Sequence, residues 1–142
     1  MKVHHASVTL HGEEHIEIID VTKIVGTAVH ESGIRSGIVI ANALHTTCAL
    51  FVNEFQAALV EDLKALVDRL VPPAAGYNHD DPRYSDCERG NADAHLRTAL
   101  LGRSIALGVN DGELMLGRFQ SIIFAELDGP RPRAIDVQVI GE

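Results

Sequence analysis

The chain has few cysteines, no long hydrophobic run and no signal-peptide pattern. These absences argue against a disulfide-stabilised, a membrane-spanning and a secreted protein, respectively. Two cysteines among 142 residues, Cys48 and Cys87, form no CxxC pair, so they indicate free thiols in a reducing compartment rather than a disulfide framework. Without a run of about 18 apolar residues, no membrane span is expected. The start, Met1 to His5, lacks the apolar core of a signal peptide. We therefore expect a cytoplasmic protein.

Basic residues are also scarce relative to acidic ones. Twelve Lys and Arg against 20 Asp and Glu give a net charge of −8. Nonspecific nucleic-acid binding and docking on anionic membranes both require a basic surface. We therefore expect neither nucleic acid nor a membrane as partner. A small anionic substrate is compatible with this charge only if local arginines, histidines or a metal attract it.

Common catalytic and cofactor motifs are missing as well. The glycines between 102 and 117 match no P-loop or dinucleotide fingerprint, and no GxSxG elbow or Ser-His-Asp order is present. Eight histidines are a high count for this length. An excess of histidine suggests metal binding or acid–base work, and composition does not choose between them.

The order of hydrophobic patterns predicts a single α+β domain over residues 1–142. Because strands precede, separate and follow the helices without βαβ regularity, we expect mixed, mostly antiparallel sheets in a sandwich-like arrangement. Residues 74 to 90 are expected to be an irregular, functional loop. The expected helices are 21 to 32, 57 to 70 and 91 to 100. The expected strands are 3 to 10, 15 to 19, 37 to 41, 45 to 54, 104 to 109, 113 to 116, 119 to 127 and 134 to 140, with residues 11 to 14 turning the first into the second.

The stretch from His45 to Glu54 concentrates polar groups at both ends of a predicted buried strand. A histidine and two threonines precede the apolar run 49 to 52, and Asn53-Glu54 follows it. A strand does not need these polar groups, so their clustering at the ends of a rigid element is typical of a site. Each residue taken singly also fits ordinary strand or turn preferences. Cys48, in its apolar context, is expected to be an inert buried thiol.

Three histidines are candidates for one shared site. His45 lies beside the central strand, His79 in the long loop and His95 on the last helix. Three neutral imidazoles plus water make an open, catalytic type of metal site, although their spacing is not a metal motif. Glu54 is the candidate acid–base group. Arg118, Arg131 and Arg133 are candidates for binding carboxylate or phosphate, with pairing to acidic residues of the chain as the alternative.

Taken together, these residues resemble the YjbQ family, often labelled secondary thiamine-phosphate synthase. The resemblance covers about Thr9 to Glu142 and rests on the order and spacing of short segments. One departure is that the family often has Gly-Thr-Trp-Gln where this chain has Gly117-Arg118-Phe119-Gln120. The matching segments are His45-Thr46-Thr47, Asn53-Glu54, Asp62, Pro72, Tyr77-x-His79, Asn91-x-x-x-His95-Leu96, Gly102-x-Ser104, Asp111-Gly112-x-Leu114-x-Leu116-Gly117 through Gln120, Asp128-Gly129-x-Arg131-x-Arg133 and Gly141-Glu142.

The resemblance implies a homotrimer and a polar pocket. It implies a divalent metal on His45, His79 and His95, zinc or similar, with magnesium possible alongside a diphosphate. The label implies joining hydroxymethylpyrimidine diphosphate to thiazole phosphate with release of diphosphate. Aromatic residues, at 4% of the chain, leave little to shield the developing pyrimidine cation. The implied catalytic residues are His45 and Glu54, and the implied substrate-binding residues are Thr46, Thr47, Asn53, Gln120, Arg131 and Arg133.

Two functions of different classes follow. The first is a metal-assisted enzyme acting on a small phosphorylated substrate, with thiamine-phosphate synthase chemistry as a side activity. The second is a nonenzymatic homotrimer whose histidines bind a metal or a metabolite. Turnover in a substrate screen separates the two.

Overall fold

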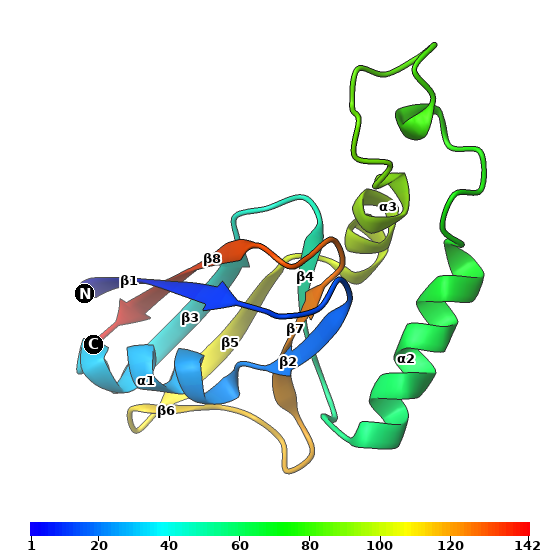
Figure 1. The fold of residues 1–142 in the computed structure, drawn as a ribbon. Coiled ribbons are helices and arrows are strands. Elements are labelled where there is room, and N and C mark those ends of the chain that lie inside the picture. Colours follow the sequence, from blue (N-terminus) through cyan, green and yellow to red (C-terminus); the bar gives the residue numbers. More distant parts are fainter.

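The computed structural model covers residues 1–142 and folds into two antiparallel sheets with three α-helices (Figure 1). No helix is both long and apolar enough to cross a membrane. The elements are β1 (Lys2–His11), β2 (Glu17–Asp20), α1 (Thr22–Ser32), β3 (Ser36–Ala43), β4 (Cys48–Asn53), α2 (Ala57–Leu70), the 3-10 helix η1 (Asn78–Asp80), α3 (Ala92–Leu101), β5 (Ser104–Asn110), β6 (Glu113–Leu114), β7 (Ser121–Glu126) and β8 (Pro132–Gly141).

The strands form a five-stranded sheet in the order β1-β8-β3-β5-β6 and a three-stranded sheet in the order β2-β7-β4. The α+β class, the three helices and the single small domain are confirmed. Every strand pair is antiparallel. The expectation that the sheets would be mixed was therefore wrong in that detail, because no pair of strands runs parallel.

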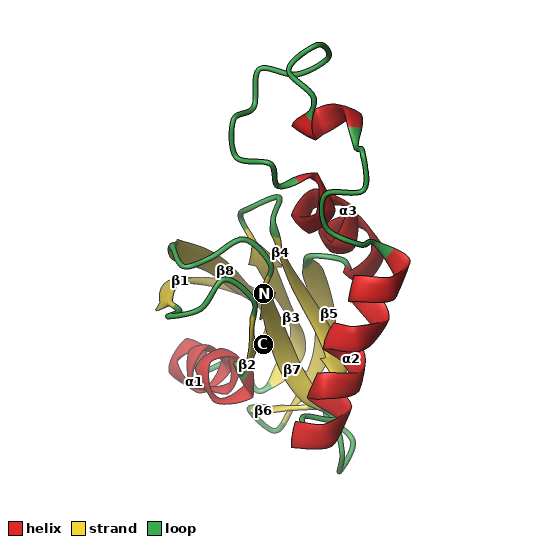
Figure 2. Ribbon diagram, turned by 45° about the vertical axis from the view of Figure 1, so that its right-hand side comes forward, coloured by secondary structure: helices red, strands yellow, loops and turns green.

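The main core lies between the two sheets, and α1 contributes to it (Figure 2). Val39, Val137 and Val139 enter it from the five-stranded sheet, and Leu50 and Phe124 enter it from the three-stranded sheet. In β3 and β8 these residues alternate with more exposed ones, as the two-residue period of a strand with one buried face requires. Leu50 of β4 and Phe124 of β7 have buried neighbours as well, because both faces of the three-stranded sheet are covered. The sheets are thereby fixed face to face, so their ends meet at defined positions.

The other face of the three-stranded sheet is covered by α3 and α2. A smaller apolar cluster joins Ala94 of α3 to Ala49 and Ala125. The apolar stripe of α2 is only partly buried, with Leu59 38%, Leu66 42% and Leu70 62% exposed. The outer face of this sheet therefore carries a tightly packed half under α3 and a looser half under α2.

The predicted hairpin between the first two strands was wrong. β1 pairs along its whole length with β8, from Lys2↔Gly141 to His11↔Pro132, whereas β2 pairs with β7 of the other sheet. Residues 12 to 16 carry the chain from one sheet to the other. The segment lacks an Asn-Gly or Asp-Gly pair, the residues that favour a tight hairpin turn.

Helix bounds agree more closely with the sequence pattern than strand bounds do. The helix predicted for 57 to 70 is confirmed, and Gln56 caps it through a bond from the Leu59 N–H. The side chain of Asp20 accepts from the N–H of Thr22 at the start of α1. β6 is confined to Glu113–Leu114 and β7 begins at Ser121. His45 to Thr47 form a bend before β4 rather than its first residues.

Candidate functional site

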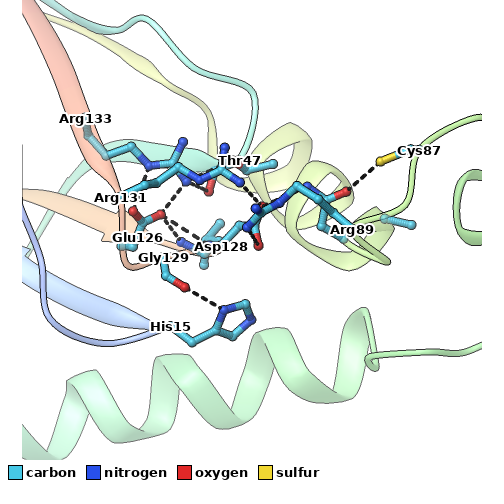
Figure 3. Close-up of polar contacts among 12 residues, drawn as sticks. His15, Thr47, Cys87, Arg89, Glu126, Asp128, Gly129, Arg131 and Arg133 are labelled. Carbon is cyan, nitrogen blue, oxygen red and sulfur yellow. Dashed lines mark hydrogen bonds and ion pairs between the residues drawn. The ribbon is translucent and has the colours of Figure 1, made fainter.

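Buried polar side chains gather where β7 ends and the chain turns into β8 (Figure 3). Glu126 is the last residue of β7, Asp128 and Arg131 lie in the turn, and Arg133 is the second residue of β8. Thr47 joins them from the bend before β4. Because β7 and β8 belong to different sheets, this turn is a point where the two sheets are connected covalently and through side chains.

Arg133 and Glu126 form a fully buried ion pair. Both side chains are 2% exposed, the Arg133 Nε donates to Glu126 Oε1 at 2.7 Å, and Nη2 donates to Oε2. The Nη2 also donates to Thr47 Oγ1 at 2.9 Å. The Glu126 carboxylate further accepts from the backbone N–H of Leu127 and of Asp128. Burial disfavours the guanidinium charge, but the bonds and charge of Glu126 outweigh it and raise the pKa of Arg133.

Asp128 is the acceptor for three side chains. Arg89 donates to it through Nε and Nη2, both at 3.0 Å, and Asn91 and Arg131 donate at 2.8 and 2.9 Å. Burial alone would raise the pKa of Asp128, but the bonds from Arg89 and Asn91 and the charges of both arginines lower it overall. The contact ties residues 89 to 91, and therefore the start of α3, to the β7–β8 turn.

Asn91 precedes α3 but does not use its side chain to cap that helix. Its amide donates to Asp128, and the N–H of Ala92 is accepted instead by Asp80 at 2.9 Å. Asp80 belongs to η1, so the cap fixes part of the long loop against α3. The loop is anchored at this point, which places His79 beside the helix.

The other side of the turn is held by His15. Its Nδ1 lies 3.0 Å from the carbonyl of Gly129, and its own carbonyl accepts from the Gly129 N–H at 2.9 Å. A Cβ at Gly129 would lie 2.6 Å from the Glu14 carbonyl and 2.7 Å from Glu126 Cγ. Only glycine allows this close approach, so the segment before β2 and the β7–β8 turn are locked together.

The structure brings two of the three candidate histidines into contact. The rings of His79 and His95 have centroids 4.7 Å apart. Burial and the neighbouring His79 lower the pKa of His95. His45 is held separately, because its Nε2 accepts the backbone N–H of Ala134 at 2.8 Å. Burial and the charge of Arg133 lower the pKa of His45, so both His45 and His95 favour the neutral form.

These histidines do not form a metal-binding set within one chain. No group of three or more His, Cys, Asp or Glu side chains converges in the structure. The Nε2 lone pair of His45 is already used by a backbone N–H, which leaves only its Nδ1. The residues present therefore do not fit the three-histidine metal site that the resemblance implies.

A cavity of about 350 Å³ has His95 in its lining. Its lining is mostly polar and comes from α3, the turn after it and the bend before β4. The Thr98 hydroxyl in this lining is buried and has no hydrogen-bond partner, and Thr98 is 6% exposed. At the rim, Arg103 is exposed and donates from Nη1 to Asn42. The lining residues are Thr46, His95, Thr98, Ala99, Gly102 and Arg103.

Three other predicted site residues lie at the opposite end of the same strands. Asn53 pairs with Ser121 at one end of β4 and β7, whereas Cys48 pairs with Glu126 at the other. Six strand residues span roughly 20 Å, so Asn53, Glu54 and Gln120 are remote from the histidines of their own chain. The side chain of Gln120 accepts from the N–H of Gly117.

The predicted arginines and Cys48 also have definite positions. Arg133 is committed to Glu126, so its fork is not open to a phosphate. Arg131 donates to Asp128 and is 32% exposed, which leaves donors facing outward. Cys48 is buried, and burial raises the pKa of its thiol to about 11, so the thiol is not a nucleophile at neutral pH.

Sequence reasoning missed several residues that build this end of the molecule. Glu126 was part of an apolar strand, Arg89 part of an irregular loop, and Thr98 an interior helix residue. A charged residue among the six apolar residues of the strand predicted for 119 to 127 is a signal for a buried partner, and Glu126 could have been found that way. No pattern in the sequence pairs Arg89 with Asp128, 39 residues away.

Comparison with known proteins decides the family. A family model described as "UPF0047 protein YjbQ-like" matches residues 6–142. The chain belongs to the YjbQ-like UPF0047 family. A UPF0047 protein of Methanothermobacter thermautotrophicus is 40% identical over 142 residues, which is 100% of this chain and 95% of that protein. A UPF0047 protein of Archaeoglobus fulgidus is 42% identical over 132 residues, 93% and 98% of the two chains.

Solved structures of the YjbQ-like family share the fold. A YbjQ-like protein of unknown function from Sulfolobus solfataricus P2 matches with a TM-score of 0.91 and 33% identity, over 99% of each chain. A hypothetical protein from Aeropyrum pernix K1 matches with a TM-score of 0.88 and 33% identity, over 97% of this chain and 98% of that one. The family and fold predicted from sequence are thereby confirmed. None of these descriptions names a substrate.

Breaking the buried ion pair tests its structural role. Arg133→Met leaves the Glu126 charge buried without its partner, so we expect a loss of about 3–5 kcal/mol in the free energy of unfolding. Adding Glu126→Gln removes that charge and keeps an acceptor for the Leu127 and Asp128 N–H groups, so the double variant should recover part of the loss. Urea unfolding measures both. A loss below about 1 kcal/mol for Arg133→Met would contradict this role.

The lowered pKa of Asp128 predicts how stability depends on pH. A carboxyl whose folded pKa lies below its unfolded value of about 3.9 stabilises the fold above that pH, and the contribution disappears as pH falls through the folded pKa. Asp128→Asn should therefore be less stable than the parent at pH 7, by about 1.5–3 kcal/mol. The difference should shrink in thermal unfolding at pH 2 to 3. Asp86→Asn, an exposed loop variant, is the control and should follow the parent at every pH.

Proposed function

We propose that the protein binds a small phosphorylated molecule in the cavity beside His95 and acts on it as an enzyme. The observation that carries the proposal is the Thr98 hydroxyl, which is buried in the cavity wall without a partner. A buried hydroxyl that lacks a hydrogen bond costs about 1–3 kcal/mol, so a ligand that reaches the Thr98 oxygen after a small movement of the wall recovers that cost. Phosphate oxygens are suited to this, because they accept bonds from several directions.

The rest of the cavity wall supplies cationic and neutral donors. Arg103 places a guanidinium at the rim, and one of its nitrogens is already oriented by Asn42. Thr46 adds a second hydroxyl and His95 an imidazole. At Gly102 the backbone has a positive φ of +84°, and nothing lies within 4 Å of the position a Cβ would take. This leaves open space beside the arginine in which an anion can approach the backbone.

His95 is the residue we propose for proton transfer. Its lowered pKa keeps it neutral at pH 7, and a neutral imidazole both accepts and donates a proton. In the reaction considered below, His95 would give its proton to the departing diphosphate, and His79, whose ring centroid lies 4.7 Å from that of His95, would return a proton to it. His45 positions the start of β8 through its bond to Ala134, so it has a structural role within one chain. Glu54 lies at the other end of β4 and is not the acid–base group of this cavity.

The reaction that the family resemblance suggests is the joining of hydroxymethylpyrimidine diphosphate to thiazole phosphate. In that reaction the carbon–oxygen bond to the diphosphate breaks, a carbon–nitrogen bond to the thiazole forms, and diphosphate leaves. Arg103 and Arg131 would neutralise the departing diphosphate, and Thr46 and Thr98 would donate to it. The alternative remains a nonenzymatic homotrimer that binds the same kind of ligand without turnover.

Titration with diphosphate tests the cavity directly. Arg103→Gln should weaken diphosphate binding at least tenfold, because one charge-assisted bond is lost. Thr98→Val keeps the side-chain shape, removes the hydroxyl and should weaken binding several-fold. Arg69→Gln, on an exposed face of α2, is the matched control and should bind as the parent does. Equal affinity in all four proteins, measured by calorimetry, would place the anion elsewhere.

Turnover then separates the two functions. The parent should release diphosphate from the paired precursors, and His95→Ala should lose that release while keeping diphosphate affinity within about threefold. Binding by the parent without turnover on any phosphorylated substrate would favour the nonenzymatic alternative.

Metal content tests the cofactor that the resemblance implies. Because His79 and His95 meet without a third ligand, we expect less than one tightly held zinc ion per purified chain, and magnesium uptake only together with diphosphate. Elemental analysis of the parent and of His95→Ala measures this. One zinc ion per chain that is lost in His95→Ala would contradict the expectation and establish the histidine metal site.

A further inference from the structure

The tip between β6 and β7 presents an aromatic side chain to solvent. Phe119 is 65% exposed, and the Arg118 guanidinium lies over its ring at 5.4 Å from the centroid. Arg118 forms no ion pair with any residue of its own chain. The tip therefore combines an apolar ring, which gains from being covered, with a cation that has no partner in its own chain and needs one if it is covered.

An unfilled apolar pocket lies between α2 and the outer face of the three-stranded sheet. Its volume is about 200 Å³, and seven of its ten lining residues are hydrophobic. Leu59, Leu63 and Leu66 line it from α2, and Phe51 and Ile123 line it from the sheet. This is the looser half of the sheet face, where α2 leaves its leucines partly exposed. The apolar lining predicts an apolar occupant.

Two carboxylates stand in the lining of the same pocket. Glu54 and Asp62 are both exposed, and neither forms an ion pair with a basic residue of the chain. An occupant with an apolar body and a cationic head would match both the lining and the carboxylates. Arg118 and Phe119 have this composition.

We propose that the Arg118–Phe119 tip of one copy of this chain inserts into the α2 pocket of a second copy. The Phe119 ring fills the apolar cavity, and the Arg118 guanidinium lies against the Glu54 and Asp62 carboxylates. An apolar cavity of about 150 Å³ is enough to hold a benzene ring, so the pocket is large enough for a phenyl side chain. Opposite charges at its rim fix the orientation of the inserted tip.

The inserted tip does not come from the same chain. Phe119 is not among the residues that line its own pocket and stays largely exposed. Because tip and pocket are different surfaces, each chain offers one of each, and the contact can repeat from chain to chain until a ring closes. Such a ring is compatible with the homotrimer that the family resemblance implies, which remains a prediction.

The first experiment compares two exposed arginine–aromatic pairs by sedimentation velocity. Phe119→Ala should weaken self-association at least tenfold relative to the parent. Tyr84→Ala is the matched control, because Tyr84 is 68% exposed and lies under Arg83 at 5.5 Å, in a loop remote from the pocket. It should assemble as the parent does. A parent that stays monomeric at micromolar concentration would overturn the proposal.

The second experiment exchanges the charges across the contact. Arg118→Glu should weaken assembly at least tenfold, and adding Glu54→Arg should restore most of it. A mixing experiment uses two variants: Phe119→Ala, which has no tip, and Leu63→Arg, whose pocket is blocked. Each should form few oligomers alone. Mixed, they should form a one-to-one dimer, because the tip of Leu63→Arg still fits the pocket of Phe119→Ala.

Circular dichroism establishes that each variant is folded before its self-association is compared with that of the parent. Unchanged assembly of folded Phe119→Ala and Arg118→Glu would overturn the proposal and place the contact elsewhere, for example on the open face of the five-stranded sheet around Ile38 and Ile140. Failure of the mixed sample to form a dimer would overturn it as well. None of these outcomes depends on diphosphate binding, so they are independent of the proposed enzyme function.

Discussion

The buried ion pair between Arg133 and Glu126 determines how the polar end of this protein is built. It joins the start of β8 in one sheet to the end of β7 in the other, and it adds Thr47 from the bend before β4. A buried pair of this kind gives little net stability over an apolar pair, but losing one partner is costly. Its effect is therefore to specify one arrangement of the two sheets at this end. Glu126 also accepts the N–H groups of Leu127 and Asp128, which orients the turn that follows.

The cavity depends on that turn through a short series of contacts. Asp128 is positioned by the turn and holds Arg89 and Asn91. Asn91 directly precedes α3, and Asp80 caps the same helix from the long loop. The helix then presents His95 and Thr98 to the cavity, next to Thr46 from the bend that Arg133 contacts. Structural residues thus determine the position of the residues proposed to bind and react. Arg133, Glu126, Asp128 and Arg89 are charged, but their contacts with one another explain them without a role in chemistry.

The sequence predicted elements whose cause is local and missed contacts whose cause is distant. The bounds of α2 follow from its leucine spacing and the prolines after it, and both were visible. The separation of β1 from β2 into different sheets depends on β8, more than 120 residues away, and no local pattern contains it. The family motifs grouped His45 and His95, and the structure places both at the end of the sandwich where β4 begins and α3 packs. They also grouped Glu54 and Gln120 with the histidines, although strand length keeps these groups apart within one chain. Arg133 shows the same limit of sequence reasoning. An arginine suits a carboxylate and a phosphate equally well, so the sequence alone does not tell that Arg133 is paired with Glu126.

The central claim is that a phosphorylated ligand binds beside His95, at the end of the sandwich organised by Arg133. Backbone amide NMR of the uniformly labelled protein, titrated with diphosphate, tests it most directly because residues other than proline along the whole chain report. The account predicts saturable shifts at Thr46, Thr98, Gly102 and Arg103, with no comparable shifts around Glu54 and α2. Shifts confined to the α2 pocket, or no saturable shift at millimolar diphosphate, would contradict it.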